Sequence, residues 1–300
     1  MIYASAEAYL DAPQKAVALF GMSGLGKTRT AAMLRGEGGW FHYSVDYRIG
    51  TRYMGEHIVD NFKREAMRNP FLRDLLLSDS IYIASNITFE NLAPLSTYLG
   101  KPGDPAKGGI GFDDYIARQR QHRAAEIASL LDTAKFIEKA RDIYGYPHFM
   151  ADTGGSICEV VTPEDPEDPV LTALSSQLLL VQIRGTETEE EELVRRFVKD
   201  PKPMYYPEGL LRALWAEYRT ARGVGEAGVD PDDFIAWGFR RLLSHRVPRY
   251  EAMARRWGVS VEAEEIAAVQ TPEDFDALIA QAITRRIAQD ASLSAAKSTG

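Results

Sequence analysis

The sequence of 300 residues predicts an α/β fold, in which helices cover both faces of a parallel sheet. Two observations lead to this class. Short apolar runs typical of buried parallel strands alternate along the chain with segments of helical composition and periodicity. The apolar fraction of 45% and the charged fraction of 26% are also those of an ordinary globular protein, which argues against a disordered or coiled-coil chain.

Four strands are predicted. Residues 16–20 form an apolar run that ends at a glycine, and residues 40–45 are aromatic and β-branched. Residues 147–151 form a third strand that ends at Asp152, and residues 178–183 form the clearest apolar run of the chain.

Helices are predicted around these strands from helix-forming composition and apolar spacing. A capping box of Thr188 and Glu191 predicts another helix after the fourth strand. Glycine and proline crowd the second half of residues 78–111, which we expect to be largely loop. The other predicted helices are 28–35, 52–67, 71–77, 113–144, 208–222, 232–244, 248–256 and 272–287.

Charge and cysteine content limit the classes of partner. With 35 basic and 43 acidic residues the net charge is -8, which argues against nucleic acid or an anionic membrane as the main partner. The single cysteine, Cys158, permits no intrachain disulfide, and neither a signal peptide nor a membrane-length apolar run is found. We therefore expect a cytoplasmic protein. These features leave the oligomeric state and a protein partner open.

Residues 21–28 read Gly-Met-Ser-Gly-Leu-Gly-Lys-Thr and match G-x-x-x-x-G-K-[ST] at every fixed position. A buried strand precedes the motif and a helix begins within it, which is the context that a phosphate-binding loop requires. The glycines let the backbone curl so that several N–H groups point at one anion, and the helix N-terminus adds partial positive charge. The motif therefore predicts a P-loop NTPase fold that binds a nucleoside triphosphate.

Two side chains of this loop have specific predicted roles. Lys27 can reach the β- and γ-phosphates, and the Thr28 hydroxyl can ligate Mg²⁺. The predicted cofactors are therefore ATP and Mg²⁺. The predicted nucleotide-binding residues are Gly21, Met22, Ser23, Gly24, Leu25, Gly26, Lys27, Thr28 and Arg29.

Aspartates stand at the ends of two other predicted strands, where ligands bind in such sheets. Asp46 ends the second strand, and Asp152 ends the third, just before Gly154 and Gly155. One carboxylate near Mg²⁺ and another near an acceptor hydroxyl would suit phosphoryl transfer. For each aspartate, a helix cap or a turn is the alternative role. The five histidines show no metal-ligand spacing, and we expect packing or surface roles for them.

The chain resembles the shikimate kinase group of small P-loop kinases in three further segments. Ser44-Val-Asp46-Tyr-Arg48-Ile49 is similar to the group's second-strand motif, which implies that Asp46 orients or deprotonates the acceptor hydroxyl. The family usually has an acidic residue at the position of Ser44. Its replacement here makes Asp152 the candidate acidic partner of the metal.

The other two segments concern the acceptor and the phosphates. Residues 150–155 resemble the family's third-strand glycine turn, although Ser156 replaces one glycine, and this implies acceptor binding at Gly154 and Gly155. Residues 246–250 resemble its Arg-x-Pro-x-Tyr segment, which implies that Arg246 grips an anionic group of the acceptor. Arg195 and Arg196 occupy the place of a lid arginine over the phosphates. With Lys27, Asp46 and Asp152 they complete the predicted catalytic set.

We treat residues 1–300 as a single P-loop kinase-like domain with a helical insertion at 55–145, a lid region at 199–231 and a flexible tail at 291–300. The insertion has no counterpart in the family that the chain resembles. The leading prediction is ATP- and Mg²⁺-dependent phosphoryl transfer to a small anionic acceptor. The alternatives are an ATPase that regulates a protein partner through the inserted helices, and a nucleotide-binding module without turnover.

Overall fold

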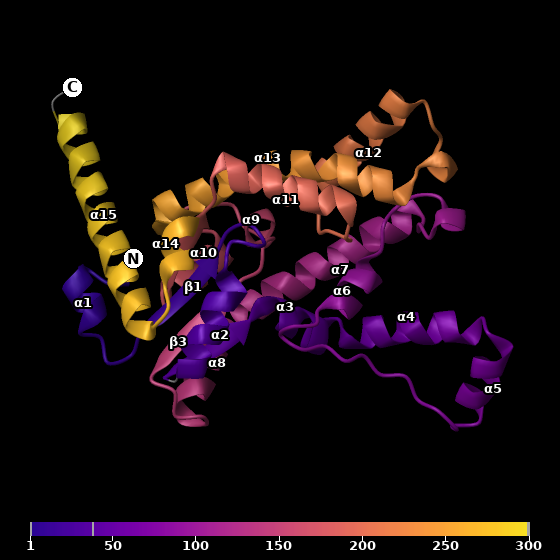
Figure 1. The fold of residues 1–300 in the computed structure, drawn as a ribbon, viewed down its shortest axis with the longest axis horizontal. Coiled ribbons are helices and arrows are strands. Elements are labelled where there is room, and N and C mark those ends of the chain that lie inside the picture. The colour runs from indigo at the N-terminus through magenta and orange to yellow at the C-terminus, as the bar shows by residue number, and fades with distance from the viewer. Residues whose placement is uncertain (1, 38, 299–300) are drawn as a thin grey trace. The chain divides into compact units, whose positions relative to one another are not determined.

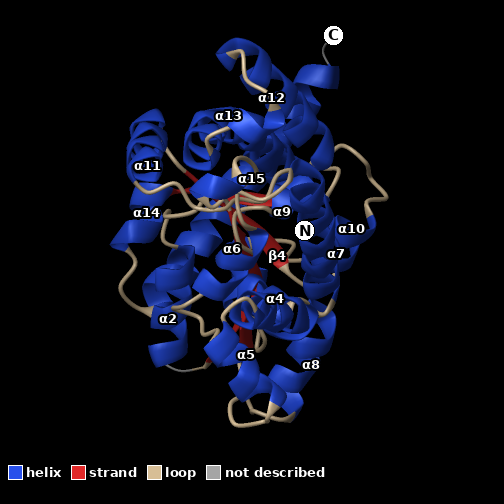
Figure 2. Ribbon diagram, turned by 90° about the vertical axis from the view of Figure 1, so that its right-hand side faces the viewer, coloured by secondary structure: helices blue, strands red, loops and turns tan. Residues whose placement is uncertain are grey.

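The computed structural model describes residues 2–37 and 39–298, and its chain is traced in Figure 1. The described residues form a parallel sheet of five strands in the order β2-β3-β1-β4-β5, drawn red in Figure 2. This confirms the predicted α/β class with a parallel sheet. The strands are β1 (Ala16–Phe20), β2 (Trp40–Ser44), β3 (His148–Asp152), β4 (Leu179–Arg184) and β5 (Gly258–Glu262).

Helices cover both faces of the sheet. On one face, α2 (Lys27–Glu37), α14 (Ala263–Ala268) and α15 (Pro272–Ser298) contribute to a core that includes Val17, Leu19 and Val181. On the other face, Phe136 of α8 (Thr133–Asp142) contacts the rings of Phe41 and Tyr43 from β2. Because successive strand residues point to opposite faces, β2 supplies Trp40 to the first core and Phe41 to the second.

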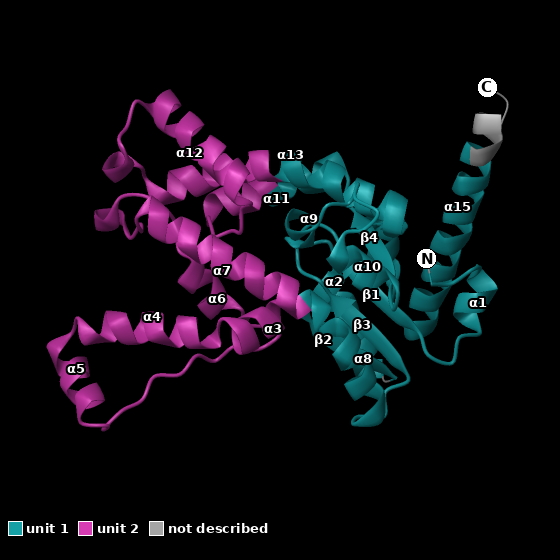
Figure 3. Ribbon diagram, turned by 180° about the vertical axis from the view of Figure 1, so that it is seen from behind, with its two compact units in different colours: residues 1–45, 130–193, 243–300 teal, residues 46–129, 194–242 magenta. Residues whose placement is uncertain are grey.

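The chain forms two compact units, which Figure 3 distinguishes by colour. Unit 1 comprises residues 1–45, 130–193 and 243–300 and contains the sheet. Unit 2 comprises residues 46–129 and 194–242. The remaining helices of unit 1 are α1 (Ala6–Leu10), α9 (Ile157–Val160) and α10 (Pro169–Ser175), and α11 (Glu187–Lys199) and α13 (Pro231–Trp257) run from one unit into the other.

Unit 2 is helical and has its own core. Phe112 and Trp215 stack with ring centroids 4.5 Å apart, and Phe234 meets Trp215 edge to face. Two of the helices that line this core are α7 (Phe112–Leu131) and α12 (Glu208–Arg222). The other helical segments are α3 (Val45–Arg48), a π-helix at Ile49–Tyr53, α4 (Gly55–Met67), α5 (Pro70–Leu77), α6 (Ala93–Leu99), and 3-10 turns at Pro105–Lys107 and Glu226–Gly228.

The predicted insertion and lid distribute between these units. Residues 55–129 of the insertion belong to unit 2, whereas residues 130–145 belong to unit 1. The single helix predicted for 113–144 is therefore wrong, because the chain forms α7 and α8 with Asp132 between them. The lid region, 199–231, lies in unit 2 and contains α12.

Helix boundaries differ from the sequence prediction in other places too. The helices predicted at 232–244 and 248–256 are one helix, α13, with Pro248 inside it. The capping box at the start of α11 uses Thr186 and Glu189, since the Thr186 amide donates to Glu189 Oε2 at 2.8 Å and the Glu189 amide to Thr186 Oγ1 at 3.3 Å. The prediction of Thr188 and Glu191 is thus two residues late.

Residues 93–99, predicted as loop, form α6, where Pro94 stands in the first turn and is compatible with a helix start. α15 reaches Ser298, within the predicted tail at 291–300, and residues 299 and 300 lie outside the described residues. No helix in the described part of the chain is long and apolar enough to span a membrane.

Asp276 of α15 joins the start of unit 1 to its last helix. Its carboxylate accepts a hydrogen bond from Tyr9 Oη at 2.7 Å and pairs with the ammonium group of Lys15. The Lys15 side chain is only 10% exposed, so removal of its partner leaves a buried charge. We expect Asp276→Ala to lower the free energy of unfolding by about 3 kcal/mol.

Urea denaturation measures this loss, with Glu273→Ala on the same helix as the control. Glu273 is exposed in the first turn of α15, and its replacement should change the free energy of unfolding by less than about 1 kcal/mol. Equal losses in the two variants would contradict a specific role for the buried pair.

Candidate functional site

The carboxyl ends of β1 and β3 are neighbours in the sheet, and the chain leaves them in opposite directions. From β1 it continues to β2, beyond β3, and from β3 it continues to β4, beyond β1. In open α/β sheets, ligands bind in the crevice that such a divergence leaves at the carboxyl ends. Residues 21–28, which we call the glycine loop, follow β1 directly, and Asp152 is the last residue of β3.

The glycine loop has a backbone that favours glycine. The φ angles of Gly21, Gly24 and Gly26 are 134°, 86° and 97°. At Gly21 a Cβ atom would also stand 2.5 Å from the carbonyl oxygen of Ile183 in β4. The loop therefore lies close against the neighbouring strand and leads into α2, whose N-terminus carries partial positive charge.

Lys27, the first residue of α2, is buried, with 5% of its surface exposed. Its Nζ donates hydrogen bonds to the carbonyl oxygens of Gly21 at 2.9 Å and Met22 at 2.8 Å. The ammonium group is thus held against the loop's own backbone. A charge in this place can exchange neutral carbonyl partners for the oxygens of an anion.

Thr28 and Asp152 are brought together by the start of α2 and the end of β3. Thr28 Oγ1 donates to Asp152 Oδ2 at 2.7 Å, and the Gly154 amide approaches Asp152 Oδ1 at 3.3 Å. Asp152 is buried, with 7% of its surface exposed. A hydroxyl and a carboxylate oxygen are ligands that suit Mg²⁺, which usually takes one or two protein ligands and completes its shell with water and substrate phosphates. The described residues contain no group of three or more His, Cys, Asp or Glu that could hold a metal.

His42 of β2 is buried and lies near enough to Asp152 for that charge to affect its pKa. From the sequence it was expected to have a packing or surface role. Burial lowers its pKa to about 4, while the negative charge of Asp152 opposes this shift and Arg35 adds to it. His42 is therefore neutral at pH 7. In the register of β2 and β3, Ser44 is opposite Asp152 and His42 is opposite Met150. A neutral His42 does not compensate the negative charge of Asp152.

The turn after β3 packs against the glycine loop. A Cβ at Gly155 would stand 2.9 Å from Ser23 Oγ and 3.8 Å from Arg246 Nη1. Gly154 has a φ of 73°, which also favours glycine. Of the predicted site residues, unit 1 therefore gathers Lys27, Thr28, Asp152, Gly154, Gly155 and Arg246 around this turn and the loop.

We expect Gly155→Ala to displace Ser23 and with it the glycine loop, because a Cβ cannot stand 2.9 Å from Ser23 Oγ without movement. Affinity for a ligand of the loop should fall by about tenfold, the effect of roughly 1.4 kcal/mol. Titration with Mg·ADP measures the change. Gly209→Ala is the control, since a Cβ there meets no atom within 4 Å. If Gly155→Ala leaves the affinity for Mg·ADP unchanged, the turn does not support the loop.

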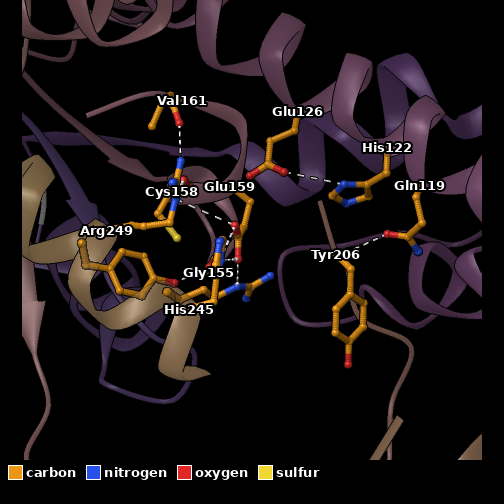
Figure 4. A network of polar contacts seen from close by, with 12 residues as sticks. Gln119, His122, Glu126, Gly155, Cys158, Glu159, Val161, Tyr206, His245 and Arg249 are labelled. Carbon is orange, nitrogen blue, oxygen red and sulfur yellow. Dashed lines mark hydrogen bonds and ion pairs between the residues drawn. The ribbon is translucent and has the colours of Figure 1, made fainter. Parts of the chain in front are cut away.

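Arg246 is buried in α13 and paired with Glu159 of α9. Its Nε donates to Glu159 Oε1 at 3.0 Å. Figure 4 shows Glu159 with His245 and Arg249 of α13. Burial lowers the pKa of Arg246, but the nearby Tyr250, Cys158 and Glu159 outweigh this and raise it above its ordinary value. The guanidinium thus stays charged beside Gly155. Glu159 is not among the predicted site residues, and its only signal in the sequence is an acidic residue within the apolar segment Ile157–Val160.

Three predicted residues belong to unit 2. Asp46 stands in the first turn of α3, two residues after the end of β2, and Arg195 and Arg196 are exposed on α11. The last predicted nucleotide-binding residue, Arg29, is exposed on α2 in unit 1, where its Nη1 donates to the carbonyl oxygen of Ala267 at 3.0 Å. This contact fixes Arg29 to α14 rather than to the glycine loop.

Comparison with protein-family models, with curated proteins and with solved structures finds no match to this chain. The candidate site is therefore defined by its own residues. It combines a curled glycine loop at a helix N-terminus, a buried lysine against that loop, and a hydroxyl–carboxylate pair at the carboxyl end of the adjacent strand.

Proposed function

We propose that the protein has a P-loop NTPase fold, binds ATP with Mg²⁺, and transfers the γ-phosphoryl group to a small anionic acceptor. The observation that carries the proposal is the hydrogen bond of 2.7 Å between Thr28 Oγ1 and Asp152 Oδ2. It stands at the end of a loop whose sequence and backbone both suit phosphate. A glycine turn with a merely structural role would require neither the hydroxyl nor the buried carboxylate.

The nucleotide would bind through the loop amides, the N-terminus of α2 and Lys27. Phosphate oxygens would replace the carbonyls of Gly21 and Met22 as partners of the Lys27 ammonium group. Thr28 and Asp152 would hold Mg²⁺, which neutralises charge on the phosphates as the phosphoryl group leaves. The hydrogen bond between Thr28 and Asp152 places the two oxygens that would hold the metal 2.7 Å apart.

The acceptor would lie at the carboxyl ends of β2 and β3. Asp46 stands two residues after the end of β2, and its carboxylate is suited to orient or deprotonate a hydroxyl group. Arg246, charged and next to Gly155, is suited to bind an anionic group of the acceptor. For Arg195 and Arg196, which belong to unit 2, neutralising the transferring phosphoryl group stays a prediction from the resemblance to small P-loop kinases.

An ADP-release assay coupled to a colour reaction tests this function. The purified protein is given Mg·ATP and a library of small alcohols that carry a carboxylate or phosphate group. At least one should raise ADP release above the basal rate, and mass spectrometry should find that compound with one added phosphoryl group. If ATP binds but no acceptor raises the rate, the kinase proposal fails.

An ATPase that regulates a protein partner is the second candidate. It is favoured by apolar side chains on and just after α5 in unit 2, where Phe71, Leu77 and Tyr82 are 70%, 70% and 89% exposed. Surface apolar groups of this kind often mark protein contacts. This candidate predicts ADP release without any acceptor, and Phe71→Ser with Leu77→Ser should leave that basal rate unchanged while abolishing stimulation by a partner.

A further inference from the structure

Glu159 is a carboxylate that α13 surrounds with basic side chains. Its own side chain is 0% exposed. Arg246 Nε lies 3.0 Å from Oε1. His245 Nδ1 lies 3.1 Å and Arg249 Nε 3.9 Å from Oε2 (Figure 4). A buried carboxylate is costly unless such partners are present. The basic side chains of α13 therefore stabilise the buried Glu159 carboxylate, and the same ion pairs hold α13 against α9.

The same face of α13 holds the backbone of the turn and of α9. Arg249 Nε donates to the carbonyl oxygen of Cys158 at 2.7 Å, and its Nη2 donates to that of Val161 at 2.6 Å. Tyr250 Oη donates to the carbonyl oxygen of Gly155. These contacts attach the segment after β3 to α13 without the help of Glu159. Because the attachment does not depend on the Glu159 carboxylate, we look for its role in the ion pair with Arg246.

The pair with Glu159 fixes the plane of the Arg246 guanidinium. A guanidinium is planar, so the bond from Nε to Oε1 sets the direction in which Nη1 and Nη2 point. A Cβ at Gly155 would stand 3.8 Å from Arg246 Nη1 and 2.9 Å from Ser23 Oγ of the glycine loop, so this end of the guanidinium lies near the turn and the loop. The Arg246 side chain is 4% exposed, which leaves little water to screen its charge. One charged group is therefore held in a set orientation beside the glycine loop.

We propose that Glu159 is a positioning residue, which orients Arg246 to bind an oxyanion beside the Gly154–Gly155 turn. The proposal rests on the proposed function, because it takes the glycine loop to hold a nucleotide. The oxyanion is a phosphoryl or carboxylate group. This oxyanion is either the γ-phosphate of the nucleotide or the anionic group of the acceptor. In both cases Glu159 acts through Arg246 and touches no substrate.

Glu159→Gln tests the proposal, because it preserves the size of the side chain and removes its charge. Calorimetric titrations compare three probes: Mg·ADP, Mg·AMP-PNP, and inorganic phosphate added to protein saturated with Mg·ADP. The variant should bind Mg·ADP within about twofold of the wild type. It should lose about tenfold in affinity for Mg·AMP-PNP if the oxyanion is the γ-phosphate, or for inorganic phosphate if it belongs to the acceptor.

Two further variants complete the design. Glu167→Gln is the matched control, since Glu167 is exposed in the loop before α10 and should change none of the three affinities. Arg246→Lys keeps the positive charge but cannot present a fork of N–H groups, so it should show the same selective loss. It also keeps the test decisive if Glu159→Gln does not fold.

The affinities of the wild type and of the variants distinguish a failure of the Glu159 role from a failure of the nucleotide site. If the wild type does not bind Mg·ADP, the nucleotide site itself is refuted, and the role of Glu159 with it. If the wild type binds but the folded variants lose affinity for all three probes equally, Glu159 only supports the fold. If no affinity changes, Arg246 does not bind an oxyanion. In both of the latter cases the positioning role is overturned while the nucleotide site stands.

Discussion

Lys27→Ala is expected to lower the rate of ADP formation by at least about a hundredfold, the effect of removing one preorganised group that stabilises transition-state charge. The ammonium group is buried against the glycine loop, where its charge is weakly screened and already close to the position that we propose for the phosphates. Alanine removes this charge, and the carbonyls of Gly21 and Met22 lose their shared donor.

The coupled ADP-release assay measures this rate, and circular dichroism checks that the variant is folded. Lys63→Ala is the control, because Lys63 is half exposed on α4, where it pairs with Asp60 at 3.3 Å. The control should keep the wild-type rate. A Lys27→Ala protein with more than half of the wild-type rate would mean that the turnover does not use the glycine loop.

Asp152→Asn is expected to have the second largest effect. Asparagine keeps an oxygen that can accept the hydrogen bond from Thr28 Oγ1, but it removes the negative charge that we propose holds Mg²⁺. The rate of ADP formation should fall by about a hundredfold at low Mg²⁺. High Mg²⁺ should restore part of it, because a weakened metal site can still be filled by mass action.

Rates measured over a series of Mg²⁺ concentrations check this result. Asp165→Asn is the control, since Asp165 is exposed and caps a turn by accepting from the Glu167 amide at 2.9 Å. The control should follow the wild-type Mg²⁺ curve. An Asp152→Asn curve with the wild-type midpoint would contradict a role of Asp152 at the metal and leave it a turn residue.

The first four strands could be predicted because each is rich in apolar or aromatic residues and ends at or just before a glycine or a polar residue. β5 could not, because Gly258–Glu262 follows α13 without a turn sequence between them. Its register also depends on a close approach that no local pattern reveals, since a Cβ at Gly258 would overlap the carbonyl oxygen of Leu180. The single helix α13 could not be predicted either, because a proline usually ends or kinks a helix, yet Pro248 lies inside this one.

The candidate site was predictable where its chemistry is local. The glycine loop carries its conformation in its own residues, and Asp152 is marked by its place at a strand end. Glu159 was not predictable, because its partner Arg246 is 87 residues away. The same holds for His42, whose low pKa comes from burial in the folded sheet. Residues that act through distant partners become visible only in three dimensions.

Titration of the wild-type protein with Mg·AMP-PNP is the decisive experiment for nucleotide binding at the glycine loop. We expect saturable binding of one nucleotide per chain, weakened by removal of Mg²⁺ with EDTA and abolished by Lys27→Ala. Absence of binding to the folded protein at millimolar nucleotide would contradict this expectation. So would binding that neither EDTA nor Lys27→Ala affects, because the nucleotide would then lie outside the glycine loop.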